Sequence, residues 1–385
     1  MTRVIEFLIS LAIVATLFLL IGIVLPSHRH LSEKTETNRK QTIVFDTLNS
    51  FRRFDDWNPL VLHDPRMQIK LSGPATGVGA QLDYTSNEEN VGSGSYKITE
   101  SIPKEKVTYA ITNPDRGNDK ASVFTLRPTG RNNRNVEIRQ SYDVDYGWDI
   151  LGRYAGLYVT RFVGDNIKMG LSRLTNMLAS VPNIDYALSG SNMIGLQTVD
   201  LPAEHVLFVN SGSVPRGNAE IAASMNANIE WIKRTMVANG LQAAGPLRIV
   251  TNELGRETYN FDVSQLVRKG SGAPAPVDDS DSDVADADAT AAETAPAAPM
   301  AAGSDAPMAL KMQGPVEYVQ NPARRAVRAS YTGYITGLEA VRNALRAWAL
   351  TQGYEVINRP YESYKSGVAG AFTETGQFDV YWDIK

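Results

Sequence analysis

The chain has 385 residues, enough for two or three domains, and its 43% hydrophobic and 21% charged residues are typical of a globular protein. It contains no cysteine, which excludes disulfide bonds, thiolate metal ligands and a cysteine nucleophile. Its four histidines are scattered, so we expect neither a metal site nor a cofactor. The net charge of −4 and the lack of a basic cluster with interleaved aromatic residues argue against nucleic-acid binding.

The first 26 residues are predicted to be a membrane anchor. Residues 7–25 carry no charge, and about 19 residues at roughly 1.5 Å each just span a hydrocarbon core of about 30 Å. A cleaved signal peptide is the alternative, but its apolar stretch is usually about 7–15 residues long. No small-x-small cleavage site precedes Pro26. We therefore expect an uncleaved, single-pass helix in a bacterial inner membrane.

The side of the membrane is weakly specified by charge. Arg3 and the amino terminus, offset by Glu6, compete with four basic residues that follow the span. Counting these charges favours a cytoplasmic body, whereas the short N-terminus and an Ala/Pro/Asp-rich linker suit a periplasmic one. We favour the periplasm. The four basic residues are Arg29, Lys34, Arg39 and Lys40.

Residues 27–183 are predicted to form the first soluble unit. Apolar residues at helical spacing predict a short helix over residues 42–51. Apolar residues again recur at helical spacing over residues 151–178 and predict one long helix. Its glycines indicate either that the helix packs closely on a sheet or that it is kinked. Between these helices, after a turn at residues 57–59, six alternating segments predict half-buried strands. They are residues 67–71, 80–84, 95–99, 106–111, 121–126 and 135–142.

Short motifs in this unit carry a family resemblance. Phe-Asp-Asp-Trp-Asn-Pro at 54–59 precedes Asp-Pro at 64–65, Gly-Val-Gly-Ala at 77–80 and Val-Gly-Ser-Gly at 91–94. With the order helix, strands, long helix, these motifs resemble the polyketide cyclase/dehydrase branch of the START-like superfamily. Leu60 stands where that family usually has an aromatic residue. The resemblance implies a curved antiparallel sheet wrapped around the last helix and a ligand cavity, with Trp57 at the mouth.

Residues 184–385 contain an internal repeat. Each copy reads strand, helix, strand, strand, and neither half can bury its own sheet, so a paired pseudo-symmetric domain is predicted. The whole chain is therefore expected to be of the α+β class. The landmarks of the first copy are Pro202, the strand 205–209, Gly212 and Trp231, and those of the second are Pro322, the strand 326–329, Gly333 and Trp348.

This doubled pattern resembles the GyrI-like effector-binding domain. The resemblance implies that apolar or cationic small molecules bind in the cleft between the two halves. It also implies that some stand-alone members hydrolyse strained electrophiles. The DNA-binding helices that usually accompany this domain in transcription activators are absent from the sequence, and a membrane span replaces them.

A linker at about residues 271–308 interrupts the second unit. It holds eight Asp or Glu residues, no Lys or Arg, and no aromatic residue. Its local charge of about −8 leaves about +4 on the rest of the chain. Because little in it could form a core, we predict a disordered, solvated insertion.

Asp379 is the candidate catalytic residue. The GyrI-like resemblance implies a cleft-facing glutamate near the last strand, and Asp379 occupies the matching position with a side chain shorter by one methylene. Among aromatic residues its carboxyl would have a raised pKa and could act as a general base. Alternation puts Asp379, Tyr381 and Asp383 on one strand face, and a face with two carboxylates is more often exposed to solvent. Asp379 is therefore a candidate ligand contact as well, with a solvent-facing role as the alternative.

Aromatic side chains are the other candidate ligand contacts. Aromatic residues at helical spacing are usually core, but rings that face a cleft would suit cations through their π faces. His63 is a neighbour of Asp64, but adjacent residues on a strand point to opposite faces, so no catalytic dyad is expected. No phosphate-binding loop, Gly-x-Ser-x-Gly or metal-ligand spacing is present. The candidate contacts are Trp57, Trp231, Tyr331, Tyr334, Trp348, Tyr361 and Tyr381.

Three classes of function remain open from the sequence. The first is a membrane-anchored binder of hydrophobic or amphiphilic small molecules with two cavities, acting as a sensor, carrier or scavenger. The second is a hydrolase or cyclase for a small electrophilic or polyketide-like substrate. The third is a scaffold with filled, inert cavities. We favour the binder, because both resemblances point to ligand-binding folds and the sequence contains no recognisable catalytic constellation.

Overall fold

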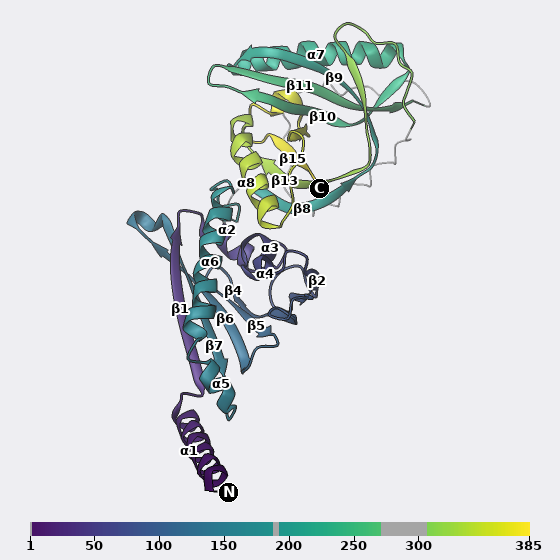
Figure 1. Ribbon diagram of the computed structural model, residues 1–385. Coiled ribbons are helices and arrows are strands. Elements are labelled where there is room, and N and C mark those ends of the chain that lie inside the picture. The colour runs from purple at the N-terminus through teal and green to yellow at the C-terminus, as the bar shows by residue number, and fades with distance from the viewer. Residues whose placement is uncertain (1, 188–191, 271–305) are drawn as a thin grey trace, which may run out of the picture. The chain divides into compact units, whose positions relative to one another are not determined.

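The computed structural model describes residues 2–187, 192–270 and 306–385. The chain is of the α+β class, as predicted, with an apolar N-terminal helix and two antiparallel sheets (Figure 1). It divides into two compact units, residues 1–188 with 347–354 and residues 189–346 with 355–385. The predicted disordered insertion at about 271–308 lies outside the described residues except for 306–308.

The N-terminal helix, α1 (Thr2–Val24), is exposed along almost its whole length. Large apolar side chains such as Leu8, Val14 and Ile21 are more than half exposed. In the described part of the chain it is the one helix long and apolar enough to cross a membrane. A signal sequence near the N-terminus can also pass this test of length and composition.

The first unit is a curved seven-stranded sheet with helices against one face. Its strand order is β1-β7-β6-β5-β4-β3-β2, and every neighbouring pair is antiparallel. The strands are β1 (His28–Thr37), β2 (Gln68–Ser72), β3 (Gln81–Thr85), β4 (Ser93–Ile102), β5 (Lys106–Thr112), β6 (Asn118–Thr129) and β7 (Asn135–Asp145). The helices are α2 (Gln41–Leu48), α3 (Phe54–Trp57), α4 (Leu60–His63), α5 (Ile150–Ala155) and α6 (Val159–Ala179).

Alternation along the strands explains this core. Every second residue of β7 from Val136 is buried, and the buried side meets α2 and α6. The apolar stripe of α6, including Leu171, Leu174 and Leu178, faces the same way. Gly170 in that stripe allows close approach, because an added Cβ would lie only 3.1 Å from Pro59 Cδ. Gly170 thus approaches the turn at Pro59, whereas the sequence analysis expected approach to the sheet or a kink.

Several elements of this unit differ from the predictions. β1 was missed because nearly all its side chains are polar, and backbone pairing with β7 holds it. The long helix predicted over residues 151–178 is two helices, because α5 ends before Gly156 and α6 begins at Val159. His63 ends the short helix α4 instead of lying on a strand, so the alternation argument about His63 and Asp64 was wrong in its premise.

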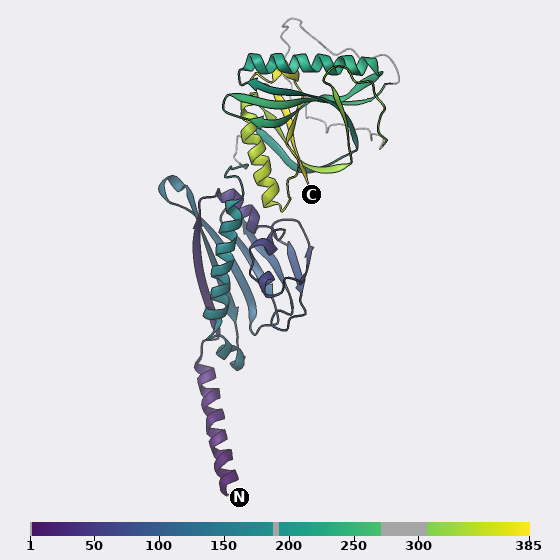
Figure 2. The same ribbon diagram turned by 45° about the horizontal axis from the view of Figure 1, so that its top comes forward.

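The second unit is an eight-stranded antiparallel sheet with the long helix α7 (Asn218–Ala238) packed along β9 and β11 (Figure 2). The strand order is β12-β9-β11-β10-β14-β15-β13-β8. The strands are β8 (Met193–Leu201), β9 (Glu204–Pro215), β10 (Leu241–Leu254), β11 (Thr258–Lys269), β12 (Glu317–Asn321), β13 (Arg324–Thr332), β14 (Tyr361–Tyr364) and β15 (Gln377–Ile384). The second long helix is α8 (Leu338–Thr351), and α9 (Gly367–Gly370) is a single turn.

The predicted repeat is present, and each copy has an additional leading strand. β8 precedes β9 in the chain but pairs with β13 of the other copy, and β12 precedes β13 but pairs with β9. The two copies therefore exchange their leading strands. β10 and β14 also pair directly, which joins the copies in the middle of the sheet. This arrangement brings residues from both copies onto one face.

Candidate functional site

A cavity of the second unit has a volume of about 670 Å³ and is lined from both copies of the repeat. One part of its wall is aliphatic and aromatic, and another part is charged. The strands β9, β10, β11, β12, β14 and β15 all contribute to it. The apolar lining is Val206, Phe208, Val250 and Val319, and the ionisable lining is Arg248, Asp262, Glu317, Arg359, Tyr318, Tyr361 and Asp383.

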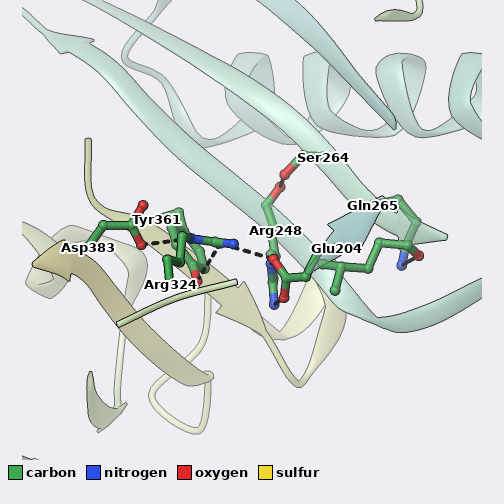
Figure 3. A network of polar contacts seen from close by, with 8 residues as sticks. Glu204, Arg248, Ser264, Gln265, Arg324, Tyr361 and Asp383 are labelled. Atoms are coloured by element: carbon green, nitrogen blue, oxygen red, sulfur yellow. Dashed lines mark hydrogen bonds and ion pairs between the residues drawn. The ribbon is translucent and has the colours of Figure 1, made fainter. Parts of the chain in front are cut away.

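A chain of alternating charges lies at this wall (Figure 3). Arg248 donates two hydrogen bonds of 2.9 Å to the two carboxylate oxygens of Glu204. Arg324 donates from Nη2 to Glu204 Oε2 at 3.0 Å and from Nε to Asp383 Oδ1 at 3.0 Å. Glu204, Arg248 and Asp383 are all at most 6% exposed. Two carboxylates and two guanidinium groups thus neutralise each other inside the unit.

Glu204 is the centre of this chain. Burial alone would raise the pKa of its carboxyl, but hydrogen bonds and charges from Arg248 and Arg324 outweigh burial and hold the pKa below its usual value. The carboxylate form is therefore the form that the fold stabilises. Two guanidinium nitrogens, Arg248 Nε and Arg324 Nη1, are buried and have no hydrogen-bond acceptor among the described residues. They are donors that an acceptor group of a ligand could use.

Both an arginine and a tyrosine of the chain itself pack on the ring of Tyr361. The Arg248 guanidinium lies over it at 4.9 Å, and Tyr381 stacks on it with a centroid distance of 5.0 Å and an interplanar angle of 9°. Burial raises the pKa of the Tyr361 phenol, so it stays neutral. Cation–π contacts in this wall are thus made by the chain's own arginine residues.

The sequence held a signal for this network that we did not use. Glu204 follows Pro202-Ala in the first copy of the repeat, and Arg324 follows Pro322-Ala in the second. Equivalent positions with opposite charges meet in a pseudo-symmetric domain when they lie near its axis. The two residues begin β9 and β13, and their side chains form an ion pair of 3.0 Å.

A second buried ion pair joins β14 to α8. Its carboxylate belongs to Glu362, the residue that follows Tyr361 on β14. Glu362 is fully buried, and Arg342 of α8 donates from Nε to Glu362 Oε1 at 2.5 Å. Glu362 Oε2 and the Tyr364 hydroxyl are buried without a hydrogen-bond partner in the described part of the chain. Burial would lower the pKa of Arg342, but Glu362 outweighs it and raises that pKa. The sequence analysis did not single out either residue.

The first unit has its own cavity of about 290 Å³ between the sheet and α6. Aromatic rings make up much of its wall, and Trp57 packs edge-on against Phe124 at 5.8 Å. Trp57 is 1% exposed, and its indole Nε1 has no acceptor among the described residues. Gln140 donates from Nε2 to Ser122 Oγ at 3.0 Å, while its Oε1 is buried and accepts no hydrogen bond from a described residue.

Two of the predicted ligand contacts line these cavities. Trp57 lines the cavity of the first unit and Tyr361 that of the second. Tyr381 lies behind Tyr361 in the stack. The other four aromatic residues are not part of either lining: Trp231 packs over Gly314, Tyr331 stacks on Phe378, Tyr334 is 45% exposed, and Trp348 is half-buried on α8.

Asp379 lies on a buried face of β15 and is 4% exposed. Its carboxylate accepts from Ser330 Oγ at 2.6 Å and Arg328 Nη2 at 2.9 Å, and Lys365 Nζ lies 2.8 Å away. The argument that a face with two carboxylates is more often exposed was therefore wrong for this strand. β13 and its neighbours supply a basic partner for each carboxylate, so Asp379 and Asp383 are both buried.

Across the described ranges, no group of three or more His, Asp or Glu side chains could hold a metal ion. No protein-family model and no curated protein matches the chain. Solved structures do match, at low similarity.

Three of the matching structures illustrate the level of similarity. The cryo-EM structure of the EcmrR–DNA complex is 16% identical, with 62% of this chain and 72% of that chain covered and a TM-score of 0.36. The EcmrR C-terminal domain is 15% identical over 50% of this chain and 99% of that chain, with a TM-score of 0.33. Truncated norcoclaurine synthase from Thalictrum flavum is 14% identical over 40% and 94%, with a TM-score of 0.31. All these TM-scores lie below 0.5, so they establish no function for this chain.

Two adjacent arginines of β13 allow a matched test of the buried network. Arg324→Ala leaves Glu204 and Asp383 buried with fewer partners and should destabilise the second unit by about 3 kcal/mol or more. Arg325 makes an exposed ion pair with Asp200 at 3.5 Å, so Arg325→Ala should cost less than about 1 kcal/mol. Urea unfolding of the full chain measures both. Equal losses in the two variants would contradict a structural role for the network.

The stability of the second unit should fall in acid because of Glu204. Its pKa is lower in the folded than in the unfolded state, so its contribution is complete above the unfolded value of about 4.3. The contribution is lost as the pH falls through the folded value. Glu204→Gln should remove up to about 1.4 kcal/mol per pH unit from the slope of unfolding free energy below pH 4. Urea unfolding between pH 3 and 6 measures the slope, and an unchanged slope in the variant would refute the assignment.

Proposed function

We propose that this chain is a membrane-anchored binder of apolar or amphiphilic small molecules, with one ligand cavity in each unit. The observation that carries the proposal is the same in both units. Each has a cavity whose wall combines apolar side chains with buried polar atoms that no described residue satisfies. Pockets for small molecules generally have this composition, with a few polar groups that orient the ligand in an apolar space.

The first unit suits an apolar ligand. Its cavity of about 290 Å³ exceeds the roughly 150 Å³ that is enough to hold benzene in an engineered core. The seven-stranded sheet, the helix α6 and the aromatic lining agree with the START-like expectation drawn from the motifs around Trp57. A ligand there would be enclosed between α6 and β4 to β7.

The second unit suits an amphiphilic ligand. Valine and phenylalanine side chains form one part of the wall, and Arg248 and Asp383 lie at the charged part. The unpaired Arg248 Nε offers a hydrogen bond to an acceptor on the ligand. The expectation of a cationic ligand from the GyrI-like resemblance receives less support, because Arg248 already covers the ring of Tyr361.

A binding function is preferred to an enzymatic one. The enzymatic alternative relied on Asp379 as a general base, and a base needs a free acceptor near the substrate. The Asp379 carboxylate contacts Ser330, Arg328 and Lys365, and Asp379 is not among the residues that line the 670 Å³ cavity.

Cavity-filling substitutions test the binding function. Val163→Trp should fill the first cavity and Val319→Trp the second, while Val237→Trp, at a site 73% exposed, is the matched control. Full chains in lipid nanodiscs are titrated with the neutral N-phenyl-1-naphthylamine and the anionic 1-anilinonaphthalene-8-sulfonate, with empty nanodiscs subtracted. The double variant should bind at least about tenfold more weakly than the control, a loss of roughly 1.4 kcal/mol. Equal binding in the two proteins would support an inert scaffold instead.

The anchor and its orientation are tested in cells. As an uncleaved anchor, α1 should keep the full 42.1 kDa chain in membranes after alkaline carbonate washing. Because the chain has no cysteine, Val237→Cys provides a single exposed thiol for labelling. A membrane-impermeant maleimide should label it in intact spheroplasts if the units are periplasmic. Labelling only after lysis would reverse the orientation, and a shortened, washable chain would indicate a signal peptide.

A further inference from the structure

The cavity of the first unit has two unsatisfied polar atoms of opposite character. Trp57 Nε1 is a donor only, and Gln140 Oε1 is an acceptor only. Both atoms are buried, both residues line the cavity, and neither atom has a partner among residues 2–187, 192–270 and 306–385. Trp57 is 1% exposed and Gln140 is 9% exposed, so bulk water does not reach these side chains freely. Buried polar groups in proteins nearly always have a partner, so the pair calls for one.

Packing holds both groups in position. The indole of Trp57 contacts Phe54 and Phe124 edge-on at 5.6 and 5.8 Å, and Gly170 lets α6 come down over it. The amide of Gln140 is oriented by its hydrogen bond to Ser122 Oγ on the neighbouring strand. A donor and an acceptor held this way before the ligand arrives lose little conformational freedom on binding.

The interior of the cavity is electrically neutral. The acidic and basic side chains of its lining, Asp115 and His63, are both exposed. Burial raises the pKa of the Tyr96, Tyr109 and Tyr142 phenols, so they stay uncharged. Trp57 and Gln140 are both neighbours of Phe124, Trp57 by ring contact and Gln140 as its cross-strand partner. An ionised ligand group beside them would lose its hydration and gain no buried counter-charge.

We infer that this cavity selects neutral aromatic molecules that carry one polar group able both to accept from Trp57 and to donate to Gln140. A hydroxyl, a lactam or a primary amide on a ring system has this chemistry. The aromatic wall supplies affinity for the ring, and the two polar atoms set its orientation and reject ionised analogues. The inference rests on the proposed binding function of the first unit and adds the class of ligand.

Three naphthalenes of similar size test the inference. They are 2-naphthol, which donates and accepts, 2-methylnaphthalene, which does neither, and 2-naphthoate, which is anionic. Each is titrated by calorimetry into the full chain in nanodiscs, with empty nanodiscs subtracted. Wild type should bind 2-naphthol about 100-fold tighter than 2-methylnaphthalene, roughly tenfold for each hydrogen bond, and should bind 2-naphthoate weakest.

Two substitutions each remove one of the two polar atoms. Trp57→Phe and Gln140→Leu should each lower the affinity for 2-naphthol about tenfold and leave that for 2-methylnaphthalene within about twofold, which also reports an intact cavity. The matched controls are Trp148→Phe, at a site 82% exposed, and Gln68→Leu, at an exposed strand position, and both should behave as wild type.

The outcomes separate the inference from the function on which it rests. Similar binding of all three naphthalenes, or equal losses for naphthol and methylnaphthalene in both variants, would overturn the polar selection and leave small-molecule binding intact. If no naphthalene binds the full chain above the nanodisc background, the cavity of the first unit is not a ligand site and both proposals fail for that unit.

Discussion

The second unit depends on one buried carboxylate. Glu204 begins β9, has almost no exposure, and accepts from Arg248 of its own copy of the repeat and from Arg324 of the other. Taking so many charges out of water is favourable only when each has a partner of good geometry. The network therefore specifies how the two copies meet, and it does so next to the cavity where a ligand would lie.

Strand exchange explains why the network can form there. β8 and β12 each cross to the other copy, so that β9 and β13 are interior strands and not edges. At the starts of these strands Glu204 is buried and Arg324 is partly buried. The direct pairing of β10 with β14 then brings Arg248 over Tyr361. Pairing and polar contacts thus reinforce each other.

The first unit uses a different physical principle. Its cavity is neutral and its shape comes from glycine and aromatic packing: Gly170 admits α6, and Trp57 fills the space below. In the sequence, the motif at residues 54–59 contributed to a family resemblance that put Trp57 at the mouth of a cavity. The structure gives Trp57 an additional property, because its packing against Phe54 and Phe124 leaves the indole N–H unpaired. The same residue is part of the core and of the candidate binding wall.

Local patterns determined most of the elements. The apolar run predicted α1, alternation predicted β2 to β7, and the repeat predicted α7, α8 and the strands around them, since these signals arise from neighbours in the chain. The strand β1 was missed because backbone hydrogen bonds hold it and its side chains are mostly polar. The short helices α3 and α4 were missed because tertiary packing, not a helical pattern in the sequence, holds them. Trp57 and Tyr361, which line the two cavities, were among the aromatic residues chosen as candidates from the sequence. Glu204, Arg248 and Gln140 were not, because a charged or amide residue looks the same in sequence whether buried or exposed. The sequence by itself thus determined the apolar N-terminal helix, the α+β class and the doubled domain. Only the tertiary structure decided which polar groups are buried, since that depends on partners far away in the chain.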